Sequence, residues 1–299
     1  MKKSFKSRYS FSDIIGIKTP NKLSHILAET RTKLQQLSVA KDLYYHPYID
    51  HRGRKPRTID RPVGELKDVQ KKILDRLLKL YPLCEIVYGA VEGRNIRDNA
   101  LKHIKKPVVV RLDLKDCFHS IKAPQVYDSF RKGFKFSRPV SKLLTELCTY
   151  KGYVPVGSPL SSMLVNVVLD PLWRRVEQLS VDSNVKSTVW VDDLIMSGEK
   201  PEELIQPVKE MINKYRLRIG WNKLDIMRSN ALQEATGCSL NSCLGVPIKK
   251  RREYALKIET LAGTDKADSN KGRISHTSFI NKAQGEQLLK LSRRFTTGG

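Results

Sequence analysis

The sequence predicts an α+β fold whose central element is a split βαβ sheet. Two apolar segments of strand length, 107–118 and 188–197, each carry a pair of aspartates. A loop of small residues followed by an apolar helix lies between them. In a split βαβ unit this order brings side chains from neighbouring strands to one edge of the sheet. We therefore expect the aspartates to lie together at that edge.

The composition indicates a polyanionic partner. The 299 residues include 55 Lys and Arg against 31 Asp and Glu, a formal net charge of +24 that is unusual for a metabolic enzyme. Such a surplus attracts nucleic acid through release of counterions, with an anionic membrane surface as the second choice. Because we find no apolar run of about 18 residues and no signal-peptide pattern, we expect a cytoplasmic protein with no membrane partner. The five cysteines show no metal-binding spacing and are expected to be reduced thiols.

A basic hairpin and an amphipathic helix are expected before the first strand. Residues 52–62 alternate cationic and turn residues, which is typical of an exposed hairpin. Such a hairpin either binds a triphosphate or backbone phosphate or is simply solvated, and both interpretations stay open at this point. Apolar residues then recur at helical spacing from Leu66 to Leu80, until Pro82 ends the pattern.

Both aspartate pairs belong to strand-like segments. The β-branched run after Pro107 predicts a strand that ends near Asp113 and Asp116. In the second segment, Asp192 and Asp193 fall within an apolar stretch, where two charges are costly unless the chain turns or a cation neutralises them. We therefore expect a hairpin with these two residues at its tip.

The remaining segments predict a loop, a helix, a hairpin and a basic C-terminal part. Small residues at 154–162 predict the loop, and 163–169 predicts an apolar helix that Pro171 kinks or ends. Residues 236–250 alternate small and apolar side chains, as a hairpin does. Residues 249–299 contain 12 Lys and Arg against 5 Asp and Glu and are expected to form basic helices.

Convergent carboxylates indicate phosphoryl-transfer chemistry. This reaction depends on positioning and on neutralising a triphosphate, which two metal ions about 4 Å apart achieve. Mg²⁺ prefers oxygen ligands and retains some of its water, so a few carboxylates on rigid strands suffice. Asp113 and Asp192 are the leading ligand candidates, and Asp193 is the adjacent supporting carboxylate. An isolated Asp-Asp pair is more often a simple turn, but Asp113 and the intervening loop and helix favour the metal site.

Four blocks of the sequence resemble the motifs of reverse transcriptases, in the same order. Residues 113–118 are similar to the first catalytic motif, 155–162 to the PQGxPxSP loop and 190–193 to the YxDD box. Residues 220–224 follow in the order expected of a further palm motif. The resemblance covers about residues 50–250, and it implies the right-hand polymerase fold of fingers, palm and thumb.

Two shorter elements favour the bacterial retron reverse transcriptases within that family. Asn99–His103 matches their NAxxH element, and Ala235–Gly237 is similar to their VTG element. His103 itself is expected to be a structural residue. The sequence departs from the family at Val156, where Gln is usual, and at Trp190, where Tyr is usual.

The resemblance implies roles for individual residues. Asp113, Asp192 and Asp193 would be catalytic and, with the backbone carbonyl of Leu114, would hold two Mg²⁺ ions, for which Mn²⁺ is a substitute. The residues that would contact the incoming dNTP are Arg57, Lys55, Phe118, Gly157 and Lys223. Of these, the two N-terminal cations would grip the triphosphate, the aromatic ring would exclude a ribose 2′-hydroxyl, and the C-terminal lysine would lie near the pyrophosphate. The glycine would let the backbone approach the nucleotide or template closely.

The resemblance also implies domains and partners. The N-terminal segment and fingers would occupy 1–105, the palm 106–245 with a fingers insertion at about 123–155, and a basic thumb 246–299. The thumb residues that would bind RNA are Lys249, Lys250, Arg251 and Arg252. The partners would be a cognate structured noncoding RNA, its reverse-transcribed single-stranded DNA, dNTPs and a separate effector protein. The implied product is multicopy single-stranded DNA linked to RNA, made in antiphage defence.

Two alternatives stay open. Another bacterial reverse transcriptase, from a defence-associated, diversity-generating or intron-derived lineage, would share the main motifs. A catalytically silent RNA-binding protein on the same fold is compatible with the departures at Val156 and Trp190.

Overall fold

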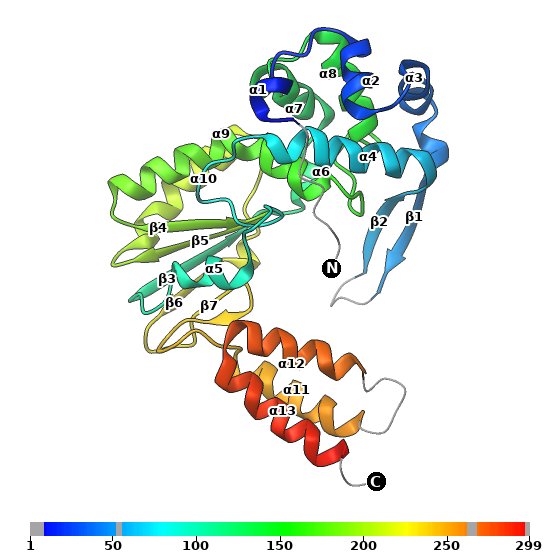
Figure 1. Cartoon of the computed structure of the whole chain (residues 1–299). Helices are drawn as coiled ribbons and strands as arrows, with labels where there is room; N and C mark the ends of the chain where they lie inside the picture. Colours follow the sequence, from blue (N-terminus) through cyan, green and yellow to red (C-terminus); the bar gives the residue numbers. More distant parts are fainter. Residues whose placement is uncertain (1–8, 52–55, 262–267, 297–299) are drawn as a thin grey trace.

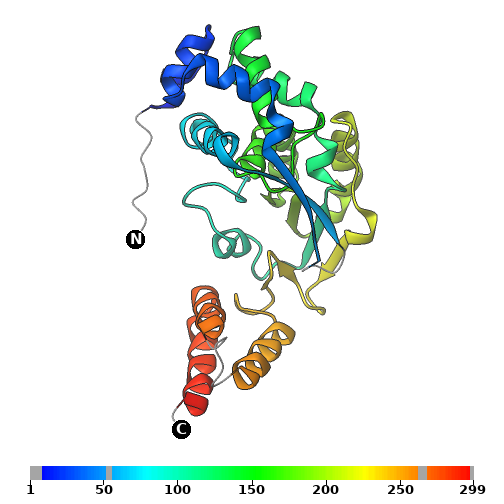
Figure 2. The ribbon, with the colours of Figure 1, turned by 90° about the vertical axis from the view of Figure 1, so that its right-hand side faces the viewer.

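A four-stranded antiparallel sheet lies between an N-terminal helical part and a C-terminal segment of three helices (Figure 1). This arrangement is seen in a computed structural model that describes residues 9–51, 56–261 and 268–296. The two groups of helices lie at opposite ends of the molecule in both views (Figures 1 and 2). The mixed helix and sheet content confirms the predicted α+β class.

The central sheet has the strand order β4-β5-β3-β6. Its strands are β4 (Lys186–Trp190), β5 (Asp193–Gly198), β3 (Val108–Asp113) and β6 (Asp225–Arg228). Successive strand residues point to opposite faces, and both faces of β3 are covered. Val108 and Val110 pack into the main core, while Val109 packs with Ile195 in a second apolar cluster. Because both faces are buried, the strand reads as an uninterrupted apolar run rather than as an alternating one.

Helices cover the main-core side of the sheet, and smaller elements complete the second cluster. The helices are α9 (Ser161–Asp182) and α10 (Ile205–Lys214), and the short helix η4 (Pro201–Leu204) directly precedes α10. The smaller elements are α5 (Ile96–Leu101), β7 (Glu234–Ala235) and β8 (Cys238–Ser239). The short helix η5 (Trp221–Lys223) follows α10 and leads into β6.

The helical part at the N-terminal end is assembled from two sections of the chain. The first contributes α1 (Phe11–Ile14), α2 (Pro20–Leu27), α3 (Arg31–Val39), η1 (Lys41–Tyr44), α4 (Gly64–Arg76) and η2 (Leu78–Leu80). The second contributes α6 (Cys117–Ser120), α7 (Ala123–Asp128), η3 (Ser129–Gly133) and α8 (Arg138–Cys148). Helix α8 packs against α2, α3 and α7, so the segment between β3 and α9 joins the N-terminal helices.

A hairpin and a helix are both present, but the hairpin begins at Tyr45, before the predicted 52–62, and only its second strand lies in that range. Strands β1 (Tyr45–Asp50) and β2 (Arg57–Pro62) pair antiparallel. The hairpin projects from the helical part toward the C-terminal segment (Figures 1 and 2). In α4 the apolar stripe predicted from the sequence is buried, at Leu66, Val69 and Ile73.

The sequence predicts that Pro171 kinks or ends the helix, and the helix does not end there. Helix α9 is 22 residues long and continues past Pro171 to Asp182. A proline inside a helix costs about 3 kcal/mol because it removes one hydrogen bond and crowds the preceding turn. Here Leu172, Trp173 and Val176 follow it and are fully buried, so burial of the second half of the helix offsets that cost.

The hairpin predicted at 236–250 is shorter and begins earlier. Strands β7 and β8 pair around Thr236 and Gly237, both of which have positive φ, as a two-residue hairpin turn requires. The chain then enters the three C-terminal helices, which are α11 (Ile248–Thr260), α12 (Asp268–Ile280) and α13 (Lys282–Thr296). The second half of the predicted hairpin is therefore a loop and the first turn of α11.

The structure bears on the expected absence of a membrane-spanning segment and on the expected state of the cysteines. Among the described residues, no helix is both long enough and apolar enough to cross a membrane. All five cysteines are free thiols, four of them buried.

Candidate active site

The three predicted aspartates lie together at one end of the central sheet. Asp113 is the last residue of β3 and stands directly opposite Asp193, the first residue of β5. Asp192 lies in the two-residue turn between β4 and β5, because Trp190 pairs with Asp193. The Leu114 N–H donates to the Asp192 carbonyl over 2.9 Å, which ties the end of β3 to this turn. Backbone hydrogen bonds therefore position all three carboxylates.

The turn that carries Asp192 is strained. Val191 has a φ of +62°, a conformation that β-branched residues rarely adopt. Such strain persists only where the surroundings hold the backbone in place. Here the Tyr88 N–H donates to the Val189 carbonyl over 2.7 Å, and the Gly89 N–H donates to the same oxygen over 3.2 Å. The segment before α5 therefore supports the turn that carries Asp192.

Gly89 allows this support because it has no side chain. A Cβ at Gly89 would lie 2.6 Å from the Val191 nitrogen and 2.9 Å from the Trp190 carbonyl carbon. The Gly89 carbonyl accepts a hydrogen bond from Asn166 Nδ2 over 2.7 Å, and Asn166 is fully buried in α9. Gly89 and Asn166 were not predicted from the sequence, because a lone glycine in an irregular loop carries no periodic signal.

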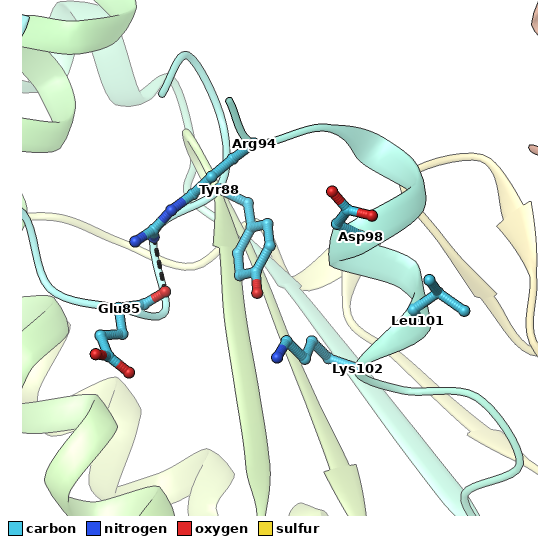
Figure 3. Close-up of a pocket in the computed structure, with 6 residues that line it drawn as sticks. All are labelled: Glu85, Tyr88, Arg94, Asp98, Leu101 and Lys102. Atoms are coloured by element: carbon cyan, nitrogen blue, oxygen red, sulfur yellow. Dashed lines mark hydrogen bonds between the residues drawn. The ribbon is translucent and has the colours of Figure 1, made fainter. Parts of the chain in front are cut away.

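Arg94 fixes the rest of this supporting loop. Its Nη1 donates to the carbonyls of Glu85, over 2.7 Å, and Val87, and its guanidinium lies 5.3 Å from the centre of the Tyr88 ring. Glu85, Tyr88 and Arg94 border a cavity of about 550 Å³ beside α5, into which Tyr88 and Lys102 project (Figure 3). None of the three aspartates lines this cavity, so the carboxylates lie apart from it, each half-buried at the end of the sheet.

The electrostatics of the carboxylates indicate a site built for cations. Burial raises the pKa of Asp193 to about 7, against the favourable charge of Arg111 and with repulsion from Asp113 and Asp192. Burial and the charge of Asp113 also raise the pKa of Asp192. The Asp193 Oδ1 atom is buried without a hydrogen-bond partner. The Lys223 ammonium forms an ion pair with Asp113, 2.7 Å from its Oδ2.

The donor set fits divalent cations that carry ligands of their own. Among the described residues, no three His, Cys, Asp or Glu side chains form a ready-made metal-binding group. Mg²⁺ does not need one, because it keeps several waters and takes one or two carboxylates together with substrate phosphates. The carboxylates of Asp113 and Asp192 supply such hard oxygen ligands. Leu114, whose carbonyl was the further predicted ligand, follows Asp113 directly.

The predicted nucleotide-binding residues that the structure describes lie on separate elements, and Arg57 and Lys223 interact with the carboxylates. Arg57 is exposed at the start of β2, and its charge lowers the pKa of Asp192 in opposition to the larger effect of burial. Phe118 is half-buried on α6, and Lys223 lies on η5. Lys55 lies outside the described residues.

Gly157 makes a close contact other than the predicted one. It has a φ of +106°, and a Cβ there would lie 2.5 Å from Ile59 Cγ2. The close approach that this glycine allows is therefore with the β1–β2 hairpin. A contact with nucleotide or template stays a prediction.

The four predicted RNA-binding cations differ in their surroundings. Lys249 and Arg252 are exposed on α11. Arg251 Nε donates to the Val246 carbonyl over 3.1 Å, and the Lys250 ammonium lies 5.9 Å from the centre of the Tyr254 ring. The first two side chains are thus the more available to a polyanion.

The two short elements of the NAxxH and VTG type are in contact with each other. Asn99 Nδ2 lies 3.4 Å from Thr236 Oγ1, which in turn lies 3.3 Å from the Ile96 carbonyl. His103 is fully buried, with Nδ1 2.7 Å from Ser197 Oγ and Nε2 2.7 Å from Thr188 Oγ1. It therefore bridges both strands of the hairpin that carries Asp192 and Asp193, and the prediction of a structural histidine agrees with this geometry.

His103 should make stability fall in mild acid. Burial lowers its pKa to about 3, against about 6.5 in the unfolded chain. The unfolded state therefore binds a proton that the folded state does not, and stability is lost as the pH falls below 6.5. We expect the wild type to lose about 2 kcal/mol more than His103→Gln between pH 7.5 and pH 5. Urea unfolding of both proteins at the two pH values measures this, and equal losses would contradict it.

The known proteins that this chain resembles are reverse transcriptases. Residues 49–258 match the model of the family described as reverse transcriptase (RNA-dependent DNA polymerase). The chain is 26% identical over 297 residues to the retron Ec86 reverse transcriptase of Escherichia coli, covering 94% of this chain and 92% of that one. It is 30% identical over 215 residues to the retron Se72 reverse transcriptase of Salmonella heidelberg (strain 579083-10), covering 69% of this chain and 57% of that one. These relatives confirm the predicted resemblance to retron reverse transcriptases.

Solved structures agree in fold. Telomerase from Candida albicans, in complex with a TWJ fragment of telomeric RNA, superposes with a TM-score of 0.54 at 11% identity, over 82% of this chain and 56% of that one. Telomerase from Candida tropicalis gives a TM-score of 0.52 at 11% identity, over 88% of this chain and 57% of that one. This chain thus spans a little over half the length of either telomerase, and the likeness confirms the polymerase fold.

Proposed function

Since the chain belongs to the reverse transcriptase family and is an RNA-directed DNA polymerase, we propose that it copies part of a cognate structured noncoding RNA into multicopy single-stranded DNA that stays linked to that RNA. The observation that carries the proposal is the register of β3 and β5, which places Asp113 opposite Asp193 with Asp192 in the adjoining turn. The similarity to retron reverse transcriptases supports the RNA-linked product.

Asp113, Asp192 and the Leu114 carbonyl would hold two Mg²⁺ ions, with Asp193 as the supporting carboxylate. When bound, these ions activate the attacking hydroxyl and neutralise the leaving pyrophosphate. The raised pKa values of Asp192 and Asp193 support this role, because burial and, to a smaller extent, repulsion between the carboxylates disfavour their ionised forms, which a bound cation would stabilise. Mn²⁺, with the same preference for oxygen ligands, would substitute.

The cations around the carboxylates would bind the incoming dNTP. Arg57 lies on β2 of the β1–β2 hairpin, and Lys223 lies on η5. Lys223 now pairs with Asp113, so it would exchange that partner for a phosphate when nucleotide binds. Phe118 on α6 would lie under the sugar and disfavour a ribose.

The C-terminal helices would hold the structured RNA through phosphate contacts. Replacing Lys249 and Arg252 by Gln is expected to weaken RNA binding about equally for all sequences and to lower the salt dependence of log K by about 1 to 2. A Lys132→Gln/Lys200→Gln protein loses the same charge elsewhere and should bind as the wild type does. Filter binding across a salt series measures both, and an unchanged slope for Lys249→Gln/Arg252→Gln would contradict the phosphate contacts.

The nucleic acid that co-purifies with the protein tests the RNA-linked product. We expect DNA of one defined sequence, joined to RNA through a branch and complementary to part of that RNA. Unbranched DNA or DNA of random sequence would contradict the retron product and favour another reverse transcriptase lineage. In the cell we propose that this complex serves antiphage defence together with a separate effector protein. Deletion of the gene should then reduce survival of phage infection as much as Asp192→Asn does.

A further inference from the structure

Asp60 is a buried carboxylate that the polymerase chemistry does not use. It lies in β2 and is 1% exposed. Among the described residues no Lys or Arg forms an ion pair with it, although the chain carries 55 such cations. Burying a carboxylate is costly unless specific partners stabilise it. Its polar partners are the Tyr153 hydroxyl, 3.3 Å from Oδ2, and His119 Nε2, 3.9 Å from the same oxygen.

Both partners lie on parts of the chain other than the hairpin, His119 on α6 and Tyr153 in the segment between α8 and α9. The other ring nitrogen of His119, Nδ1, lies 2.8 Å from Asp116 Oδ1, which fixes the imidazole ring on that side. The His119 and Tyr153 rings are in edge contact, with 4.7 Å between their centres. The Lys122 ammonium lies 5.6 Å from the centre of the Tyr153 ring on the side of α7. The imidazole thus lies between two carboxylates, Asp116 from its own segment and Asp60 from the hairpin.

This contact joins the two elements that are expected to enclose the nucleotide. Asp60 is three residues from Arg57 on β2, and His119 directly follows Phe118 on α6. Next to Asp60, Ile59 packs so closely on Gly157 that a Cβ there would lie 2.5 Å from Ile59 Cγ2. The position of the hairpin, and with it that of Arg57, is therefore fixed by a polar contact at Asp60 and an apolar one at Ile59.

We propose that Asp60, His119 and Tyr153 form a polar latch that holds the β1–β2 hairpin at the correct distance from the catalytic carboxylates for dNTP binding. The latch residues are positioning residues, since none of them touches the reacting atoms. The proposal rests on the proposed polymerase function, because it assigns Arg57 to the triphosphate. It extends that function by naming what sets the nucleotide affinity in this chain.

Single-nucleotide incorporation on a primed RNA template tests the latch. In Asp60→Asn the amide still accepts from the Tyr153 hydroxyl but no longer attracts His119. We expect KM for dNTP to rise about tenfold while kcat changes less than about twofold, since ground-state binding alone is weakened. His119→Gln should raise KM similarly, and the double variant should be no worse than either single one, because both remove the same interaction.

Two controls keep the outcomes apart. Asp128→Asn removes an exposed carboxylate that pairs with Lys132 and should leave KM and kcat unchanged. If Asp60→Asn does not fold, His119→Gln and Tyr153→Phe, at partly exposed side chains, carry the same test. An active wild type whose KM is unaltered by these substitutions would overturn the latch. Additive effects in the double variant would overturn it as well. An inactive wild type would instead overturn the polymerase function.

Discussion

Replacing Asp192 by Asn should reduce DNA synthesis by a factor of about 10³ or more, because a neutral amide is a poor ligand for a divalent ion and several kcal/mol of charge stabilisation are lost. Asp113→Asn should have an effect of the same order, since Asp113 is held beside the turn by the Leu114 hydrogen bond to the Asp192 carbonyl. Single-nucleotide incorporation with Mg²⁺ measures both rates.

The same region should be more stable without its charges. The pKa of Asp193 is about 7 in the folded protein and about 3.8 in the unfolded chain, so the folded state binds the extra proton. The free energy of unfolding therefore falls as the pH rises from about 3.8 to about 7. At pH 7.5 the ionised Asp193 carboxylate destabilises the folded protein. In a buffer with EDTA, Asp193→Asn should raise the free energy of unfolding by about 1 to 3 kcal/mol.

Replacing a metal-binding carboxylate should lower activity and raise stability, whereas replacing a structural residue should lower both. Asp128→Asn, at an exposed ion pair, should change neither the incorporation rate nor the unfolding midpoint in urea. If Asp192→Asn or Asp193→Asn lost stability along with activity, the carboxylates would be part of the structural framework and the metal-binding role would be contradicted.

Replacing Gly89 by Ala should lower kcat about 100-fold, although glycine has no side chain that could take part in the chemistry. Its Cβ would lie 2.6 Å from the Val191 nitrogen and 2.8 Å from Val191 Cγ2, so the catalytic turn has to move. A displacement of about 1 Å at reacting groups is enough for a loss of this size. Because the shift is in the carboxylates, kcat should fall more than KM for dNTP rises.

Gly272→Ala is the matched control for this substitution. Gly272 lies in α12, where an added Cβ meets no atom within 4 Å, and alanine is the better helix former by about 1 kcal/mol. It should leave kcat unchanged. Circular dichroism would show both variants folded, and a Gly89→Ala protein with wild-type kcat would show that the supporting loop does not set the position of the turn.

The carboxylate hairpin could be predicted because its physical signal is local. Two adjacent charges inside an apolar stretch need a turn, and the structure places Asp192 in that turn and Asp193 directly after it. The strand before Asp113 could be predicted for the same reason, since a β-branched run buried on both faces has few other conformations.

The missed features depend on contacts between distant segments. Helix α9 passes Pro171 because of what its second half buries, and this burial is set by neighbours that the local pattern does not contain. Gly89 supports a turn that lies about 100 residues further along the chain. Asp60 reads as one more polar residue in a basic hairpin, and only the fold brings it to His119 and Tyr153.

Primer extension on an RNA template is the most direct measurement of the central claim, that Asp113 and Asp192 form the metal-dependent site of an RNA-directed DNA polymerase. The wild type should make DNA complementary to the RNA in the presence of dNTPs and Mg²⁺, and EDTA should stop it. The Asp192→Ala/Asp193→Ala protein should bind the same RNA and make no DNA. Equal extension by both proteins would contradict the assignment of the carboxylates. RNA binding without extension by the wild type would mean a silent RNA-binding protein on a polymerase fold.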